Sequence, residues 1–313
     1  MVHKRPPGSQ DPAAIAAWLR TRPSAADMAA RFPADWQYVQ AELAAAVAAR
    51  DFARLHRLLH PWEGKRQPTF EPGRCTSADA NAALRQRMAA LAVEHYSLSA
   101  VSGSQGGARR LNLLNAWMAQ RLLFVRDFER KPVALRAFNM VWPLIWQRRR
   151  LMPLVERKGI YCFYSREFVD ALARLVGTRS CHEIGAGDGT LARFLSRAGV
   201  MIAASDNYSW SDRIDYPAEV LRMDASAALR RFEPQVVICS WPPAGNGFEQ
   251  HIFRTPSVEL YVAIVSRHEF AAGNQMAYRN QQEFEVSACA ALSALLLPPE
   301  LGCQVLLFER RRR

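Results

Sequence analysis

The sequence lacks an uninterrupted apolar run that is long enough to cross a membrane. A membrane helix needs about 20 consecutive apolar residues, whereas the longest candidate ends at Leu295–Leu297 and runs directly into Pro298 and Pro299. The first ten residues are basic, but no apolar segment of a secretory signal follows them. These absences predict a cytoplasmic protein without a membrane partner.

Cysteine is also scarce. The chain has 6 cysteines in 313 residues, and none of them forms a C-x-x-C pair. This pattern indicates free thiols in a reducing compartment and argues against both a disulfide framework and a metal site. Half of the residues are hydrophobic, and the length is enough for about two domains.

Negative charge is scarce in the first half. Residues 1–160 contain 25 Lys and Arg against 12 Asp and Glu, whereas residues 161–313 contain 16 against 17. An excess of this kind is typical of a protein with an anionic partner such as nucleic acid. The basic residues are scattered, however, and the longest run is Arg148–Arg150, so an arginine-rich helix surface is the alternative.

Strand patterns are missing from the first half, where helical periodicity recurs. We therefore predict an all-helical N-terminal domain or cap over residues 1–158, followed by a second domain over residues 159–313. The segments that carry this pattern are Pro12–Arg20, Asp35–Leu59, Ser77–Tyr96, Leu111–Arg126 and Val133–Arg150.

A glycine-rich turn stands out in the second half. Gly185, Gly187 and Gly189 follow a short β-prone run and precede the helical pattern Leu191–Ala198. Glycines between a strand and a helix let the backbone approach a ligand and direct unpaired N–H groups toward it. Asp206 follows the apolar run after this helix, where an acid accepts hydrogen bonds from a ribose. The pattern predicts a nucleotide-type cofactor site.

The spacing of these glycines, with Glu183 two residues before the first, resembles the first motif of the class I S-adenosylmethionine-dependent methyltransferases, E/D-x-G-x-G-x-G. The resemblance covers about residues 160–313 and implies a Rossmann-like, seven-stranded methyltransferase sheet with S-adenosyl-L-methionine as the cofactor. Asp206 then matches the acid that holds the ribose hydroxyls, and Asp224 matches the acidic residue near the adenine. The implied cofactor-binding residues are Tyr164, Glu183, Gly185, Ala186, Gly187, Gly189, Asp206, Asn207, Asp224 and Ala225.

The resemblance also suggests which residues meet the amino-acid end of the cofactor. Tyr164 or Arg166, at the start of the helix candidate Arg166–Val176, is placed to meet the amino-acid end of the cofactor. Arg166 would bind its carboxylate. Packing of this helix on the sheet is the alternative.

The segment Ser240-Trp241-Pro242-Pro243 ends the next buried strand pattern, Gln235–Cys239. It resembles the D/N/S-P-P-aromatic motif of amino-methylating members, although Trp241 stands before the prolines and Ala244 replaces the aromatic after them. We take Ser240, Trp241 and Pro242 as catalytic candidates, because they can hold an acceptor nitrogen at a strand end.

His268, just past the strand pattern Leu260–Ser266, is the fourth catalytic candidate, as a base for a hydroxyl or ammonium acceptor. Glu249 is another possible base, and a structural role is the alternative for both. The sequence thus favours methylation of a nitrogen, and less so of an oxygen, on a small molecule or peptide. Nucleic-acid methylation and a non-catalytic cofactor-binding scaffold stay open, as does the oligomeric state.

Overall fold

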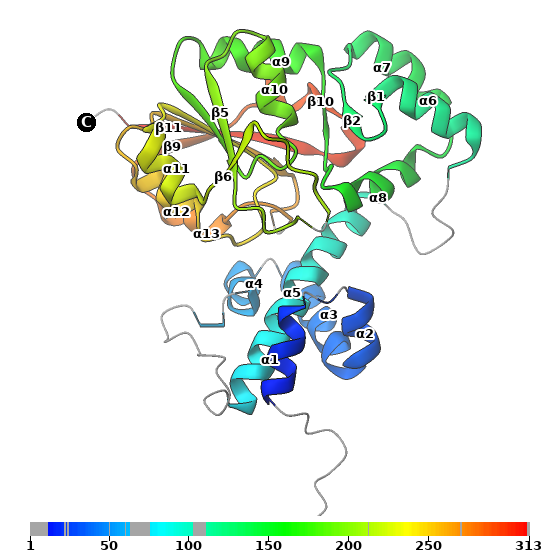
Figure 1. Cartoon of the computed structure of the whole chain (residues 1–313), viewed down its shortest axis with the longest axis vertical. Coiled ribbons are helices and arrows are strands. Elements are labelled where there is room, and N and C mark those ends of the chain that lie inside the picture. Colours follow the sequence, from blue (N-terminus) through cyan, green and yellow to red (C-terminus); the bar gives the residue numbers. More distant parts are fainter. Residues whose placement is uncertain are drawn as a thin grey trace, which may run out of the picture. The chain divides into compact units, whose positions relative to one another are not determined.

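The computed structural model of the chain describes residues 12–21, 23, 25–49, 51–59, 61–62, 76–102, 111–211, 213–269 and 271–311. It divides the chain into two compact units, Met1–Tyr96 and Ser97–Arg313. Figure 1 shows the chain and labels many of its helices and strands.

The first unit is helical in its described residues. Its core contains Met28, Val39, Leu43, Leu84 and Met88, each at most 2% exposed. The sequence predicted one helix over residues 35–59, but the structure has two helices there, because the carboxylate of residue 51 accepts the N–H of residue 54 and starts a new helix. The helices are α1 (Pro12–Arg20), α2 (Ala25–Arg31), α3 (Pro33–Ala48), α4 (Phe52–Leu59) and α5 (Ser77–Ser102), the last of which crosses the boundary.

The second unit begins well before residue 159, which corrects the predicted boundary. Phe124 packs edge-on against Phe163 with ring centroids 5.4 Å apart, and Trp142 Nε1 donates to a carboxylate oxygen of Glu300 at 3.0 Å. The segment before residue 159 therefore shares the core of the sheet-bearing unit. It also contains a small hairpin, so it is not all helical. Its elements are α6 (Leu113–Leu123), β1 (Phe124–Arg126), β2 (Glu129–Arg130), α7 (Leu135–Val141), α8 (Leu151–Val155) and the 3-10 turns Trp142–Leu144, Arg148–Arg150 and Glu156–Lys158.

The second unit is built on a seven-stranded sheet with the order β6-β5-β4-β7-β8-β11-β9. The strands β4 to β8 are parallel to one another, and β11 runs antiparallel between β8 and β9. This is the Rossmann-like methyltransferase fold that the resemblance implies, with its last strand antiparallel near the edge. The strands are β4 (Cys181–Ile184), β5 (Ile202–Asp206), β6 (Val220–Arg222), β7 (Val236–Ser240), β8 (Leu260–Ser266), β9 (Phe284–Ala288) and β11 (Cys303–Arg310); a separate pair joins β3 (Phe163–Tyr164) to β10 (Leu296–Leu297).

Helices cover both faces of this sheet (Figure 1). Along β7, Val236 and Ile238 belong to one apolar cluster, and Val237 and Cys239 belong to the other. All four side chains are at most 1% exposed, which is why the strand reads as a continuous apolar run. One cluster takes in residues of α9 (Arg166–Val176), α10 (Thr190–Arg197) and α14 (Ala290–Ser293), and the other takes in residues of α11 (Ala225–Phe232), α12 (Glu249–Arg254) and α13 (Gln275–Asn280); the 3-10 turn Pro299–Leu301 precedes β11.

The strand order reverses at β4. The chain passes from β4 to β5 and β6 on one side, and then returns to β7 and β8 on the other. In open parallel sheets, ligands bind outside the carboxyl ends of the strands at such a reversal. The fold therefore places a binding crevice at the ends of β4 and β7.

Candidate functional site

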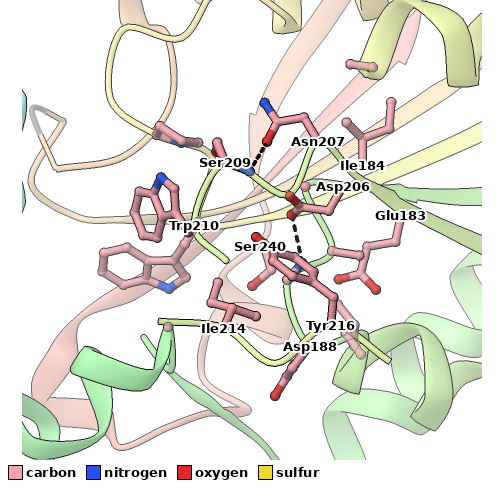
Figure 2. A pocket seen from close by; sticks show the side chains of 18 of the residues that line it. Glu183, Ile184, Asp188, Asp206, Asn207, Ser209, Trp210, Ile214, Tyr216 and Ser240 are labelled. Carbon is pink, nitrogen blue, oxygen red and sulfur yellow. Dashed lines mark hydrogen bonds between the residues drawn. The ribbon is translucent and has the colours of Figure 1, made fainter. Parts of the chain in front are cut away.

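Four neighbouring strands deliver the predicted side chains to one cavity of about 360 Å³. Along the sheet edge, Asp224 follows β6, Asp206 ends β5, Gly185 follows β4 and Ser240 ends β7. Figure 2 shows Glu183, Asp206 and Ser240 converging on this cavity. The predicted residues that line it are Tyr164, Glu183, Gly185, Ala186, Gly187, Asp206, Asn207, Asp224, Ala225, Ser240 and Trp241.

The glycine turn has the left-handed backbone that its sequence predicts. Gly185, Gly187 and Gly189 have φ angles of 66°, 55° and 65°, a region that is costly for residues with a Cβ. Gly189 does not line the cavity. It caps α10, and a Cβ on it would lie 2.7 Å from Cγ2 of Val220. Gly189 thus permits close packing of the turn against β6, and its contact with a cofactor stays a prediction.

Asp206 is held in place by the glycine turn and by its own loop. Its carboxylate accepts the N–H of Gly187 at 3.0 Å and the N–H of Tyr208 at 2.9 Å. Tyr208 stacks on Tyr216 with centroids 3.9 Å apart, and Tyr216 lines the cavity. The carboxylate therefore stands at the cavity wall in a fixed orientation.

Asp224 caps the helix α11. Its Oδ1 accepts the N–H of Ala227 at 3.0 Å, and this hydrogen bond lowers the pKa of the carboxyl group. Met223, Ala225 and Ser226 line the cavity beside it. This end of the cavity thus combines apolar surface with an ionised acceptor.

Glu183 is the most deeply buried of the lining acids, at 2% exposed. Its Oε2 accepts the N–H of Ala192 in α10 at 2.8 Å. Burial raises the pKa of Glu183 to about 8, although this hydrogen bond and the charge of Arg130 oppose the shift. The side chain is therefore sensitive to any cation that enters the cavity.

The end of β7 carries a strained turn. Trp241 has a φ angle of 57°, which is costly for a residue with a Cβ, and its N–H donates to the carbonyl oxygen of Ile264 at 2.8 Å. Its indole stacks on Tyr161, with centroids 5.4 Å apart and an angle of 22° between the rings. Strain of this kind persists where the surroundings hold it, and it often marks functional sites.

Ser240 and Tyr164 meet in the cavity, with Oγ and the phenolic oxygen 2.8 Å apart. Burial raises the pKa of Tyr164 well above its usual value, so that the phenol stays protonated. A protonated phenol can donate to or accept from the serine hydroxyl, and in either arrangement it orients that hydroxyl within the cavity.

Glu249 is a structural hub and does not line the cavity. It is 0% exposed, and its carboxylate accepts hydrogen bonds from four donors. Burial raises its pKa, and the four donors oppose the shift. The possible role as a general base is thus overturned. The donors are Tyr261 Oη at 2.5 Å, Tyr278 Oη at 2.5 Å, Asn246 Nδ2 at 2.6 Å and the N–H of Asn274 at 2.7 Å.

This hub holds the loop after β7. Asn274 Nδ2 donates to the carbonyl oxygen of Asn246, and the N–H of Gly273 donates to the carbonyl oxygen of Pro242 at 2.8 Å. Pro242 therefore stabilises the turn through its carbonyl oxygen and does not line the cavity, whereas Pro243 does.

His268 and Arg166 do not line the cavity. The N–H of His268 donates to Ser266 Oγ at 3.1 Å, and burial and Arg267 lower the pKa of the imidazole. Arg166 is exposed. Contact of either residue with a bound substrate or cofactor stays a prediction that the lining of this cavity does not support, because position after a strand or before a helix does not determine where a long side chain points.

Sequence reasoning missed an ion pair at the same cavity. Arg130 Nη2 lies 2.7 Å from Asp188 Oδ1, and both residues line the cavity. Burial lowers the pKa of Arg130, but Asp188, Tyr164 and Cys162 together raise it above its usual value. Residues 130 and 188 are far apart in the chain and share no motif. Only the presence of Asp188 within the glycine turn hinted at the site.

Carboxylates dominate the charge of the cavity. The acidic residues that line it are Glu183, Asp188, Asp206 and Asp224. Among the described residues, Arg130 contributes the lysine-type or arginine-type positive charge of the lining. A negative wall favours a cationic ligand and disfavours a pyrophosphate. The cavity therefore suits a nucleoside that carries positive charge.

Two further observations concern the described part of the chain. No three His, Cys, Asp or Glu side chains within it are grouped so that they could hold a metal ion. Within the same residues, every helix is too short or too polar to span a bilayer.

Comparison with known proteins gives structural likenesses only. No protein-family model matches the chain, and no curated protein matches its sequence. The 23S rRNA methyltransferase ErmE is 19% identical over 48% of this chain and 69% of its own, with a TM-score of 0.29. A mutant of MtNAS with S-adenosylmethionine is 11% identical over 89% and 97%, with a TM-score of 0.36. The magnesium protoporphyrin IX methyltransferase of Synechocystis PCC 6803 with bound S-adenosylmethionine is 11% identical over 69% and 97%, with a TM-score of 0.35.

The strand order decides the fold. The second unit has the class I methyltransferase fold. The glycine turn and both acids stand where that fold binds its ligands, at the carboxyl ends of the strands.

Proposed function

We propose that the chain is an S-adenosylmethionine-dependent methyltransferase that methylates a nitrogen of a small molecule or peptide. The observation that carries the proposal is the meeting, in one cavity, of the glycine turn, Asp206, Asp224 and the Ser240–Trp241 strand end. The order of the strands supports the following arrangement of the ligand in this proposal. Asp224 and Met223 hold the adenine beyond β6, and Asp206 accepts hydrogen bonds from the ribose hydroxyls at β5. The glycine turn after β4 then contacts the amino-acid end.

The charge of the cavity supports this cofactor over a dinucleotide. The carboxylates of Asp206 and Asp224 would repel the pyrophosphate of a dinucleotide, but they attract a sulfonium. Asp188 is paired with Arg130, and a cation in the cavity favours the ionised form of Glu183. The bound cofactor supplies a methyl group already activated for transfer, so the protein has to bind, orient and exclude water.

Ser240 and its neighbours orient the acceptor in this proposal. Tyr164 and Ser240 share a hydrogen bond in which either hydroxyl can donate. With Tyr164 as the donor, the lone pairs of Ser240 Oγ accept an N–H of the acceptor, and the indole of Trp241 contacts the acceptor from the side. His268 and Glu249, the two bases considered for an oxygen acceptor, do not line the cavity. Their absence from the wall favours nitrogen, whose lone pair is available without a strong base.

The test is incubation with methyl-labelled cofactor and a fractionated extract of the source cell. The labelled product identifies the acceptor and the methylated atom. The double variant Trp241→Ala/Pro242→Ala is expected to lower turnover about 100-fold, as the loss of a positioned catalytic group does. Its affinity for S-adenosylhomocysteine is expected to change less than about 10-fold.

His268→Ala is the matched control, with turnover expected at the wild-type value. Unchanged turnover in the double variant would place the chemistry elsewhere. Cofactor binding without any labelled product would leave a binding scaffold, and absence of binding would refute the proposal.

Glu183 predicts how cofactor affinity depends on pH. A cation in the cavity stabilises the ionised carboxylate, so binding of S-adenosylmethionine releases a proton while Glu183, with its pKa of about 8, is protonated in the free protein. The affinity for S-adenosylmethionine relative to S-adenosylhomocysteine, which lacks the sulfonium charge, is expected to rise from pH 6 to pH 8 and then level off. Calorimetry at several pH values measures this ratio. A ratio that is flat in the wild type, or that keeps its pH dependence in Glu183→Gln, would contradict the assignment.

A nucleic-acid acceptor is the second candidate. Residues 97–158 contain 12 Lys and Arg against 3 Asp and Glu, and this segment belongs to the same compact unit as the cavity. The positive charge thus lies on the unit that binds the cofactor, which was not expected from the sequence. Label in the nucleic-acid fraction of the extract, with binding that weakens steeply as salt is added, would favour this candidate.

A cytoplasmic location belongs to the same proposal. The five cysteines that the structure describes are free thiols, which is usual in a reducing compartment.

A further inference from the structure

Arg130 places a buried guanidinium at the wall of the cavity. Its side chain is 8% exposed, and it enters from β2, a strand of the segment that the sequence assigned to a separate domain. Nη2 donates to Asp188 Oδ1 at 2.7 Å, and Nη1 donates to the carbonyl oxygen of Cys162 at 3.0 Å. These two contacts fix the plane of the guanidinium.

The Nε–H of the same side chain is buried and finds no acceptor among the described residues. Buried N–H groups in folded proteins are nearly always hydrogen-bonded, so the guanidinium, which lines the cavity, keeps donor capacity beyond its contacts with Asp188 and Cys162. A guanidinium cannot lose its proton and offers planar, paired donors, which suit a carboxylate.

The position of Arg130 indicates which carboxylate this is. Its Cζ lies 5.4 Å from the ring centroid of Tyr164, and the hydroxyl of Tyr164 is hydrogen-bonded to Ser240 Oγ at the end of β7. Asp188, its ion-pair partner, belongs to the turn after β4. Arg130 therefore stands at the β4 and β7 end of the cavity, whereas Asp224 follows β6, two strands beyond β4 in the sheet.

We infer that Arg130 binds the carboxylate at the amino-acid end of the cofactor. The inference rests on the proposed function, because adenine at β6 and ribose at β5 leave the amino-acid end at β4. Asp188 orients the guanidinium, and Asp188 Oδ1 is itself held by the N–H of Thr190 at 3.1 Å. The cofactor site is thus completed by a residue that precedes the sheet in the chain.

The experiment compares two ligands by calorimetry. One is S-adenosylhomocysteine, and the other is its decarboxylated analogue, which keeps the amine and lacks the carboxylate. Arg130→Gln is expected to weaken binding of S-adenosylhomocysteine roughly 10- to 100-fold, as the loss of a charged hydrogen bond does. Binding of the decarboxylated analogue is expected to change less than about 3-fold, and Arg130→Lys is expected to restore part of the selectivity.

Two matched variants separate ligand binding from a purely structural role. Asp188→Asn removes the ion pair but keeps the guanidinium, so it is expected to retain the preference for the carboxylate. The double variant Arg130→Gln/Asp188→Asn leaves no unpaired buried charge. It is expected to show the same selective loss even if Arg130→Gln alone does not fold.

Several results would overturn the inference. They are an equal loss for both ligands, no loss for either ligand, and a selective loss in Asp188→Asn as large as that in Arg130→Gln. A wild-type protein that binds neither ligand would refute the proposed function itself, and this outcome is distinct from the other three.

Discussion

Asp206→Ala is expected to weaken binding of S-adenosylhomocysteine at least about 100-fold. A carboxylate that accepts two hydroxyl groups makes two charged hydrogen bonds, each of which is strong when it is shielded from water. The orientation of this carboxylate is set in advance by the N–H groups of Gly187 and Tyr208, so little ordering is needed on binding. Titration calorimetry measures the change directly.

Two controls isolate the ribose contact. Asp215→Ala changes an exposed acid that does not line the cavity, and it is expected to bind like the wild type. A ligand that lacks the two ribose hydroxyls is expected to bind the wild type and Asp206→Ala with similar, low affinity. If Asp206→Ala binds S-adenosylhomocysteine normally while it is folded by circular dichroism, the cofactor assignment fails.

Glu249→Ala is expected to lower the free energy of unfolding of the second unit by roughly 3–5 kcal/mol. The substitution leaves the buried donors of Tyr261, Tyr278 and Asn274 without an acceptor. It also creates a void in the core. The desolvation cost of the carboxylate is recovered, but that gain does not offset several unsatisfied donors. Urea titration followed by tryptophan fluorescence measures the change.

Glu285→Ala is the matched control, because this glutamate is exposed on β9. Its effect is expected to stay within about 0.5 kcal/mol. Glu249→Gln keeps one acceptor oxygen and is expected to fall between the two. A Glu249→Ala protein as stable as the control would contradict the role of this residue as a hub.

The lining of the cavity along β4, β5 and β6 could be predicted because its signals are local. The turn after β4 and the acids after β5 and β6 each follow a short apolar run, and parallel strands bring their carboxyl ends to one edge. Ser240 and Trp241 were found in the same way. Trp241 nevertheless adopts a left-handed backbone without being a glycine, which no residue preference indicated.

The parts that failed depend on long-range packing. A helical pattern over residues 111–158 does not show which core the helices join, so the domain boundary was misplaced. The Arg130–Asp188 pair joins residues 58 positions apart. His268 and Glu249 both follow strands as expected, but backbone position does not say whether a side chain faces the cavity or the interior.

Arg130 precedes the seven-stranded sheet in the chain, and this order determines how the unit can be recombined. A crossover at residue 158 would pass on every glycine and acid of the motif but leave behind the guanidinium that pairs with Asp188. It would also separate Phe124 from Phe163. A recombined module that keeps both contacts therefore has to begin before Phe124, and the compact unit itself begins at Ser97.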